Sequence, residues 1–178
     1  SNVKLDYELI YSDIKRRSPR SSFETSRKEE DTIEFLSGIL NGYTLGTPVA
    51  FRIPNKDKKS EDYDSLKDVF RPSHADRVYS EKYGIRDYRG GGRSSGRETV
   101  ARVVAGSIAK QILKTYNIQI QAFVIGIGEI SLQKEYSALD LSVAYENEVV
   151  CPDKETAENM IRYLSQIKNE KDSVGGII

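Results

Sequence analysis

The chain has 178 residues, enough for one domain with a hydrophobic core and too few for two of generous size. Its 27 basic and 27 acidic side chains cancel, so no overall charge directs it to a polyanion. The single cysteine excludes an intrachain disulfide framework and fits a reducing compartment. The sequence shows no apolar run long enough to span a membrane and no signal peptide. Composition therefore predicts a cytoplasmic protein without a membrane partner.

Both ends of the chain are unusual. Ser1-Asn2 resembles an expression scar, because no starting methionine is present. Residues 172–178 run into an apolar, strand-like segment that stops at the last residue. We therefore expect residues 1–178 to be a single-domain fragment of a longer protein, with residues 1–2 as the scar.

The first element expected is a helix. Apolar residues at helical spacing predict an amphipathic helix over residues 5–18, with Arg16 and Arg17 in its last turn and Pro19 as its stop. The polar stretch 20–31 that follows is also basic and should be an exposed loop. Such a basic segment is more often a solvated surface than a site, unless the fold brings it near other arginines.

A pair of strands should come next. Polar–apolar alternation predicts strands over residues 32–40 and 49–53, which we expect to pair antiparallel. Asn41-Gly42 is a turn signal, although the connection as far as Pro48 is too long for a two-residue hairpin loop. Residues 55–63 are charged and poor in apolar side chains, and they indicate an exposed loop.

The only histidine, His74, lies in the segment Arg71-Pro72-Ser73-His74-Ala75-Asp76. Pro72-Ser73 predicts the start of a helix that runs through Tyr83. Nearby arginines disfavour the imidazolium and a bound phosphate favours it, so we expect a pKa near neutrality. Asp76 is too close in sequence to be assumed the hydrogen-bond partner of His74. A solitary histidine is also often structural or exposed, and the local sequence leaves both roles open.

A glycine run leads into a strongly patterned helix between residues 90 and 113. Ser95 and Glu98 have the spacing of a capping box, which places the start of the helix directly after the glycines. The apolar residues that should form its buried face are Val100, Val103, Val104, Ile108, Ile112 and Leu113.

The start of this helix has the composition of a phosphate site. A run of three glycines, followed by two serines and two arginines, Arg93 and Arg97, falls within eight positions. Glycine lets the backbone approach a ligand, free N–H groups at a helix start attract an anion, and arginines fork onto phosphate oxygens. The alternative is a flexible loop with solvated arginines, which this concentration of donors makes the weaker interpretation.

The remaining elements are a strand, a helix and a final strand. Alternation predicts a long strand over residues 118–130, whereas residues 131–150 have no clear period. Pro152-Asp153 should open the last helix, with Asp153 as N-cap and an apolar stripe that packs in the core. Together the elements favour an α+β fold with mostly antiparallel strands and packed helices.

Several kinds of site are excluded by spacing. The glycine run lacks the ending of a P-loop, and no dinucleotide-binding glycine pattern follows a strand. One histidine and one cysteine, 77 positions apart, give no metal cluster and no catalytic triad. Arginines and eleven tyrosines keep a nucleic-acid surface open as an alternative, but the balanced charge and the lack of an RNA motif predict no nucleic-acid partner.

Several of these segments together closely resemble chorismate synthase. The resemblance rests on the histidine segment 71–76, on Lys82-Tyr83-Gly84 and on the segment Gly90-Gly91-Gly92-Arg93-Ser94-Ser95-Gly96-Arg97-Glu98-Thr99. Shorter matches are Leu36-Ser37-Gly38, Thr44-Leu45-Gly46-Thr47-Pro48, Asp62-Tyr63 and Asp172-Ser173-Val174-Gly175-Gly176. The likeness runs from about residue 5 to the end of the chain.

The resemblance implies a β-α-β sandwich fold and a lyase of the shikimate pathway of aromatic amino-acid biosynthesis. Such an enzyme converts 5-enolpyruvylshikimate 3-phosphate to chorismate by 1,4-anti elimination, requires reduced FMN without net redox change and forms a homotetramer. Family members are longer than this chain, so we expect the fragment alone to be inactive. Whether the flavin is reduced with NADPH, and whether this chain is only a phosphate- or flavin-binding module, are left open.

The resemblance also implies roles for particular residues. His74 corresponds to a catalytic proton donor beside the flavin, and Arg93-Ser94-Ser95 corresponds to the flavin-binding triplet. Arg17 corresponds to an arginine for the phosphate of the substrate or of NADP. We add Arg97 as a second phosphate contact, because of its charge and position.

The basic segment departs from the family pattern at two places. It reads Arg16-Arg17-Ser18-Pro19-Arg20, so its third arginine and its glycine are replaced. A second family arginine falls on Phe23. Either Arg20 substitutes for it or this subsite binds its ligand differently.

Overall fold

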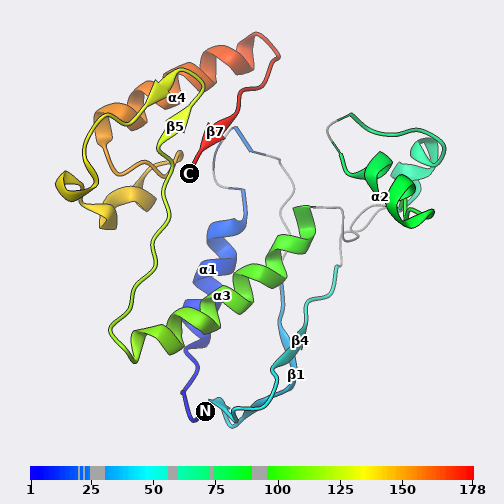
Figure 1. The fold of residues 1–178 in the computed structure, drawn as a ribbon, viewed down its shortest axis with the longest axis vertical. Helices are drawn as coiled ribbons and strands as arrows, with labels where there is room; N and C mark the ends of the chain where they lie inside the picture. Colours follow the sequence, from blue (N-terminus) through cyan, green and yellow to red (C-terminus); the bar gives the residue numbers. More distant parts are fainter. Residues whose placement is uncertain (20, 22, 25–30, 56–59, 73, 90–95) are drawn as a thin grey trace. The chain divides into compact units, whose positions relative to one another are not determined.

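The computed structural model describes residues 1–19, 21, 23–24, 31–55, 60–72, 74–89 and 96–178 (Figure 1). The chain folds as two compact units. The first comprises Ser1–Ser18 and Lys28–Ile118, and the second comprises Pro19–Arg27 and Gln119–Ile178.

The first unit begins with helix α1, Tyr7–Arg17. Asp6 caps it, because its carboxylate accepts a 3.0 Å hydrogen bond from the backbone N–H of Leu9. The helix ends at the C-cap Ser18, next to the expected stop at Pro19. The predicted helix is therefore confirmed, with its start two residues later than expected.

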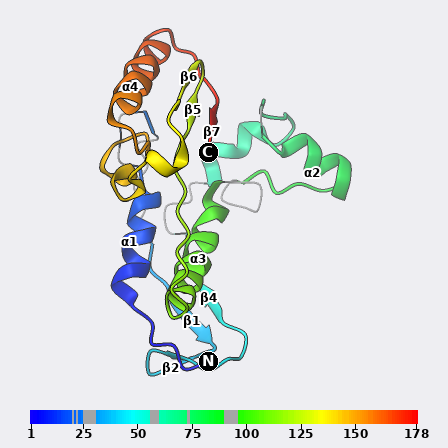
Figure 2. The ribbon, with the colours of Figure 1, turned by 60° about the vertical axis from the view of Figure 1, so that its left-hand side comes forward.

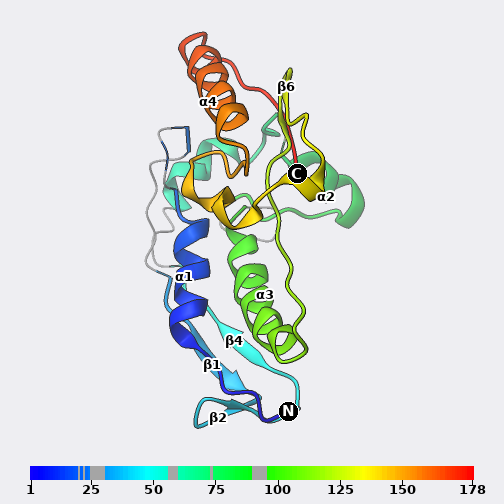
Figure 3. The same ribbon diagram turned by 90° about the vertical axis from the view of Figure 1, so that its left-hand side faces the viewer.

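Helix α3, Thr99–Lys114, lies beside α1 and follows a short 3₁₀ turn, η2, Gly96–Glu98 (Figure 3). The helix starts at Thr99, with Glu98 at the N-cap position and no side-chain cap bond there. The expected capping box involves Ser95, which lies outside the described residues. The carboxylate of Glu98 instead accepts from Arg102, one turn along the helix.

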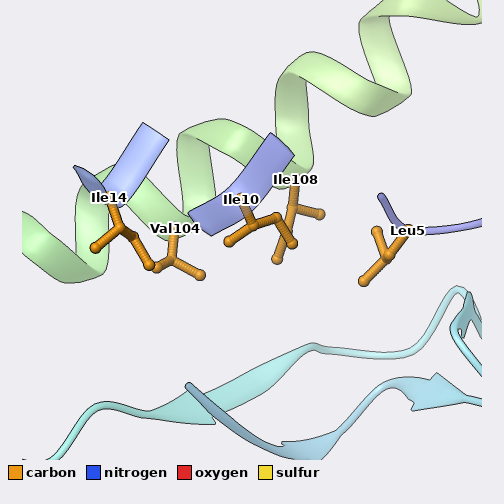
Figure 4. Close-up of a cluster of buried hydrophobic side chains, with 5 residues drawn as sticks. All are labelled: Leu5, Ile10, Ile14, Val104 and Ile108. Carbon is orange, nitrogen blue, oxygen red and sulfur yellow. The ribbon is translucent and has the colours of Figure 1, made fainter. Parts of the chain in front are cut away.

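Apolar side chains of α1 and α3 form the core of the first unit (Figure 4). They point from the helices towards the strands, whose own partly buried side chains pack against them. The buried members are Ile10 and Ile14 of α1, Val104 and Ile108 of α3, and Leu5, which lies just before α1.

The expected buried face of α3 is wrong at its C-terminal end. Ile112 is 39% exposed, while Gln111 is buried. The reason is a pair of hydrogen bonds: the backbone N–H of Asp6 donates to Oε1 of Gln111 (2.7 Å), and Nε2 of Gln111 donates to the Asp6 carbonyl (3.1 Å). This polar bracket holds the start of α1 against α3 and turns Ile112 outward.

Two antiparallel strand pairs complete the first unit. Strand β1, Glu34–Ser37, pairs with β4, Ala50–Arg52, which confirms the expected strand pair. Strand β2, Ile39–Leu40, pairs with β3, Tyr43–Thr44, through a turn at Asn41-Gly42.

The connection between β1 and β4 is longer than a two-residue loop, as expected, and Asn41-Gly42 closes the β2–β3 hairpin within it. Both have positive φ, 50° at Asn41 and 81° at Gly42, as a tight hairpin turn requires. The predicted strand over 32–40 is broken at Gly38, where φ is also 81° and an added Cβ would lie 2.7 Å from the Pro48 carbonyl oxygen.

The segment that carries the histidine is also part of the first unit. Residues 55–63, expected as a loop, include the start of a 3₁₀ helix, η1, Ser60–Leu66. Helix α2 spans Asp76–Tyr83 and ends at Gly84 in the left-handed conformation. The helix expected from Pro72 therefore begins later, at Asp76, whose carboxylate binds back to the backbone N–H and the side chain of Arg71.

The second unit packs helix α4, Lys154–Asn169, against a small antiparallel sheet (Figure 2). Its strands are β5, Gly126–Ile127; β6, Ile130–Ser131; and β7, Gly176–Ile177, in the order β6-β5-β7. Two 3₁₀ turns, η3, Tyr136–Ala138, and η4, Leu141–Glu146, lie between sheet and helix in the chain. The buried residues are Ile127, Val149, Cys151, Ala157 and Met160.

The long strand expected over 118–130 is wrong. Only Gly126–Ile127 is strand there, and Gly128, with φ 55°, turns the chain back into β6. Residues 118–125 keep the alternating sequence, but β pairing requires a neighbouring strand, and among the described residues none pairs with them as a ladder. The α+β class with antiparallel strands is confirmed.

No helix within the described ranges is long and apolar enough to cross a membrane.

Asp153 caps α4 as the sequence predicts. Its carboxylate accepts from the backbone N–H (3.0 Å) and hydroxyl (2.6 Å) of Thr156 and pairs with Lys134. The hydrogen bonds from Lys134 and Thr156 lower the pKa of Asp153 from 3.8 to about 2. A lowered folded-state pKa means that the unfolded chain binds the proton more readily, so this stabilisation is complete above about pH 4 and is lost as the pH falls towards 2.

We expect Asp153→Ala to lower the free energy of unfolding by about 1 kcal/mol at neutral pH, because α4 loses its cap. The difference from wild type should shrink between about pH 4 and pH 2. Urea unfolding across this range measures it. Asp153→Asn is the matched control, since an amide oxygen can still cap but cannot titrate. A difference between wild type and Asp153→Ala that is constant down to pH 2 would contradict the charge argument.

Candidate functional site

The predicted site residues fall in the first unit and only partly within the described ranges. Arg17 ends α1, Arg97 lies in η2, and His74 lies in the turn before α2. Arg93-Ser94-Ser95, expected from the resemblance to bind the flavin, lie outside the described residues. The site can therefore be built from its arginines, its histidine and what these contact.

Arg17 and Arg97, expected as phosphate contacts, meet at one buried carboxylate. The side chain of Asp31 is 1% exposed. Nη2 of Arg97 lies 2.5 Å from Oδ1 of Asp31, and Nη1 of Arg17 lies 3.7 Å from Oδ2. Both cations are predictable from the sequence but the acid is not, because Asp31 stands at the end of a polar segment with no motif around it.

The antiparallel packing of α1 and α3 explains this meeting. The last turn of α1 reaches the start of α3, where Nε of Arg17 donates to Oγ1 of Thr99 (3.1 Å) and Nη2 donates to the Gly96 carbonyl (3.3 Å). Arg97 in turn donates to the Pro54 carbonyl just after β4 (3.3 Å). The cluster thus ties α1, the β1–β4 hairpin and the N-terminal end of α3 together.

The two guanidinium groups are not equivalent. The Arg97 side chain is 10% exposed and close to Asp31, whereas the Arg17 side chain is 22% exposed and farther away. Among the described residues, the Asp31 carboxylate faces both guanidinium groups at the start of a helix, where the dipole is positive. Such an arrangement attracts an anion, and Arg17 is the more accessible contact.

A second buried acid, Asp13, lies on α1, one turn before Arg17. Asp13 pairs with Arg16 on its own helix and with Lys110 of α3, whose Nζ lies 2.5 Å from Oδ2. Burial raises the pKa of Asp13, but hydrogen bonds from Lys110 and Arg16 outweigh it, and the pKa is lowered overall. Asp13 therefore stays ionised and fixes the two helices at the level of the site.

His74 is exposed, and its ring has a defined contact. Nδ1 lies 2.9 Å from the Pro72 carbonyl oxygen, and its backbone N–H donates to the Arg71 carbonyl (3.3 Å). A carbonyl oxygen only accepts, so in this hydrogen bond Nδ1 carries the hydrogen. The neutral ring then has its lone pair on Nε2, which is the atom available for proton transfer.

Asp76 is not the partner of His74, as the sequence analysis cautioned. Its buried carboxylate binds Arg71 and Arg86 instead. The hydrogen bond from the Arg71 side chain is the main reason that the pKa of Asp76 lies far below its usual value. Arg86 was missed in the sequence because it stands alone beyond α2.

The departure from the family pattern at Phe23 falls in the second unit. The ammonium group of Lys168 lies 6.0 Å from the centre of the Phe23 ring, a cation–π distance. Arg20, the proposed substitute, lies outside the described residues.

The fold and these contacts define an α+β protein whose arginines gather around a buried acid where a helix begins. The sequence profile of chorismate synthase matches residues 1–178. The chain belongs to the chorismate synthase family.

Individual relatives agree with the profile. The chain is 54% identical to the chorismate synthase of Christiangramia forsetii, over 100% of this chain and 50% of that protein. It is 53% identical to that of Flavobacterium psychrophilum, over 99% of this chain and 50% of the relative. A crystal structure of chorismate synthase superimposes with a TM-score of 0.72 and 30% identity, over 98% of this chain and 48% of that one. The chain thus spans about half the length of the relatives it matches.

The unequal contacts of the two arginines lead to a stability prediction. Arg97→Ala should lower the free energy of unfolding by about 3–5 kcal/mol, because it strands the buried Asp31 carboxylate. Arg17→Ala should cost only about 1 kcal/mol, since this side chain is farther away and more exposed. Urea unfolding of both variants measures the difference.

Arg77→Ala is the control for this comparison. It removes an ion pair with Glu81 whose side chains are 71% and 62% exposed, and should leave the free energy of unfolding close to that of the wild type. Equal losses for Arg17→Ala and Arg97→Ala would show that Asp31 does not depend mainly on Arg97.

Proposed function

We propose that the protein to which this chain belongs converts 5-enolpyruvylshikimate 3-phosphate to chorismate. The reaction is a 1,4-anti elimination in which the substrate loses phosphate and a ring proton, so electrons and atoms balance without an oxidant. Family membership supports the reaction class. The observation that carries the proposal on this chain is the gathering of Arg17 and Arg97 at the N-terminal end of α3.

A phosphate leaving group needs positive charge where its negative charge develops. Arginines supply this without giving up a proton, and a helix start adds a fixed dipole. We assign the direct contact to Arg17, the more accessible of the two side chains. Arg97, which is held against Asp31, would contribute its positive charge without direct contact with the phosphate.

Reduced FMN is the cofactor we propose, bound by Arg93, Ser94 and Ser95. The described surroundings fit an anionic cofactor, because the next residues begin a 3₁₀ turn and helix beside two guanidinium groups. The chemistry that reduced FMN would supply is transient electron donation with no net redox change. The protein's part is to bind it, orient it and exclude water.

His74 is the proposed proton donor. Its Nδ1 contact with Pro72 leaves Nε2 as the atom that would hold and transfer the proton. A protonated ring would also balance negative charge on a neighbouring reduced cofactor.

We further propose a cytoplasmic homotetramer that binds no nucleic acid and no membrane. Residues 1–178 would form one domain of the longer protein and be inactive alone. Reduction of the flavin with NADPH would be a property of the whole protein. A phosphate- or flavin-binding module without catalysis is the competing function, and turnover separates the two.

The test uses the full-length protein with chemically reduced FMN and 5-enolpyruvylshikimate 3-phosphate under anaerobic conditions. We expect flavin-dependent chorismate formation, a loss of about 10²–10⁴-fold in kcat for His74→Ala, and a rise of about 10–100-fold in KM for Arg17→Ala. Arg93→Ala should mainly weaken the binding of reduced flavin.

Arg77→Ala is the control, because it is an exposed arginine on α2 that we place outside the site. Full activity in both His74→Ala and Arg93→Ala would overturn the site assignment. Flavin binding without any chorismate from the wild-type protein would favour the module over the enzyme.

A further inference from the structure

Asp76 closes the turn that carries His74. Its carboxylate accepts three hydrogen bonds from Arg71: from the backbone N–H (3.1 Å), from Nε (2.9 Å) and from Nη2 (3.0 Å). The residue is 1% exposed, so these bonds are made in a region with little water. Both ends of the segment 71–76 are therefore held together by one side chain.

Arg86 anchors this closed turn to the preceding segment. Its Nη1 lies 3.0 Å from Oδ2 of Asp76. The same guanidinium donates to three carbonyl oxygens, of Leu66 (2.8 Å), Lys67 (2.7 Å) and Val69 (3.0 Å). The side chain is 7% exposed and lies 5.3 Å from the centre of the Phe70 ring.

The geometry of His74 depends on the ion pairs that Asp76 makes with Arg71 and Arg86, which we call the clamp. Among the described residues, the imidazole bonds to the carbonyl of Pro72, and the backbone N–H of His74 bonds to the Arg71 carbonyl. Both acceptors belong to the turn that Asp76 closes. If the turn opened, the Pro72 carbonyl would no longer be held beside Nδ1.

We propose that Asp76 and Arg86 are positioning residues for His74, which keep the hydrogen on Nδ1 and leave Nε2 as the proton-transfer atom. They touch no reacting group themselves. The effect of Asp76 and Arg86 on the tautomer does not depend on what reaction the protein catalyses. Only the effect on turnover rests on the proposed function. The competing role is purely structural, in which Asp76 and Arg86 stabilise the fold without any effect on the ring.

Nuclear magnetic resonance can separate these roles, because His74 is the only histidine in the chain. Long-range ¹H–¹⁵N correlation on the 178-residue chain reports which ring nitrogen carries the hydrogen, at a pH where the ring is neutral. We expect the Nδ1–H form to dominate in the wild type. Asp76→Asn and Arg86→Lys should shift the ring towards the Nε2–H form.

The variants differ in how they weaken the clamp. Asp76→Asn keeps the shape but removes the charge that two guanidinium groups bind, and Arg86→Lys keeps the charge but loses the planar fork. Glu81→Gln is the matched control, because it breaks an exposed ion pair on α2 and should leave the tautomer unchanged. Circular dichroism establishes that each variant is folded.

The inference is overturned if the wild-type ring is mainly Nε2–H, or if both folded variants keep the wild-type tautomer. Should Asp76→Asn fail to fold, Arg86→Lys decides the outcome. Should both fail to fold, the wild-type tautomer still tests the geometry, and a purely structural role for the clamp is then preferred.

A second readout uses the full-length protein. If His74 is the proton donor, Arg86→Lys should lower kcat by about 10–100-fold while KM changes little, since misplacing a catalytic group costs rate more than binding. A tautomer shift without wild-type turnover would overturn the proposed function and leave the positioning role standing. Unchanged kcat together with a shifted tautomer would remove His74 Nε2 from the reaction.

Discussion

The antiparallel packing of α1 against α3 is the constraint on which the first unit depends. Ile10 and Ile14 meet Val104 and Ile108 in a core that excludes water, and each such side chain stabilises the fold by about 1.5–3 kcal/mol. The same packing sets the end of α1 beside the start of α3. Arg17 reaches the helix N-terminus for this reason, not because of any local motif.

Buried carboxylates hold the basic side chains of this unit in place. Among the described residues, two cations pair with each carboxylate, and at least one of them comes from another segment. The sets are Asp13 with Arg16 and Lys110, Asp31 with Arg17 and Arg97, and Asp76 with Arg71 and Arg86. A buried acid is costly unless it is paired, so each fixes the orientation of its partners. A site for a phosphorylated ligand gains from this arrangement, because arginines that are already ordered lose less entropy on binding.

Local sequence signals predicted most elements of the fold. They failed where the local structure depends on contact with a segment that is distant in the sequence. The N-cap at Asp153 and the turn at Asn41-Gly42 depend on adjacent residues, and both are found. The alternating stretch 118–130 is strand only at Gly126–Ile127, because alternation describes how side chains would face and not whether another strand lies beside them. The prediction that Ile112 lies on the buried face of α3 is wrong for a similar reason, since Gln111 is buried by its hydrogen bonds to the backbone of Asp6.

Local patterns in the chain are enough to predict helices α1 to α4, the α+β class and, through the segments around His74 and Arg93, the family. These depend on short spacings that a reader of the chain can measure. That Arg17 and Arg97 share Asp31, and that Arg86 pairs with Asp76 next to His74, follows from the packing of distant segments. A buried charge accepts whichever opposite charge the packing brings within reach, and that distance in space is not encoded in any local pattern.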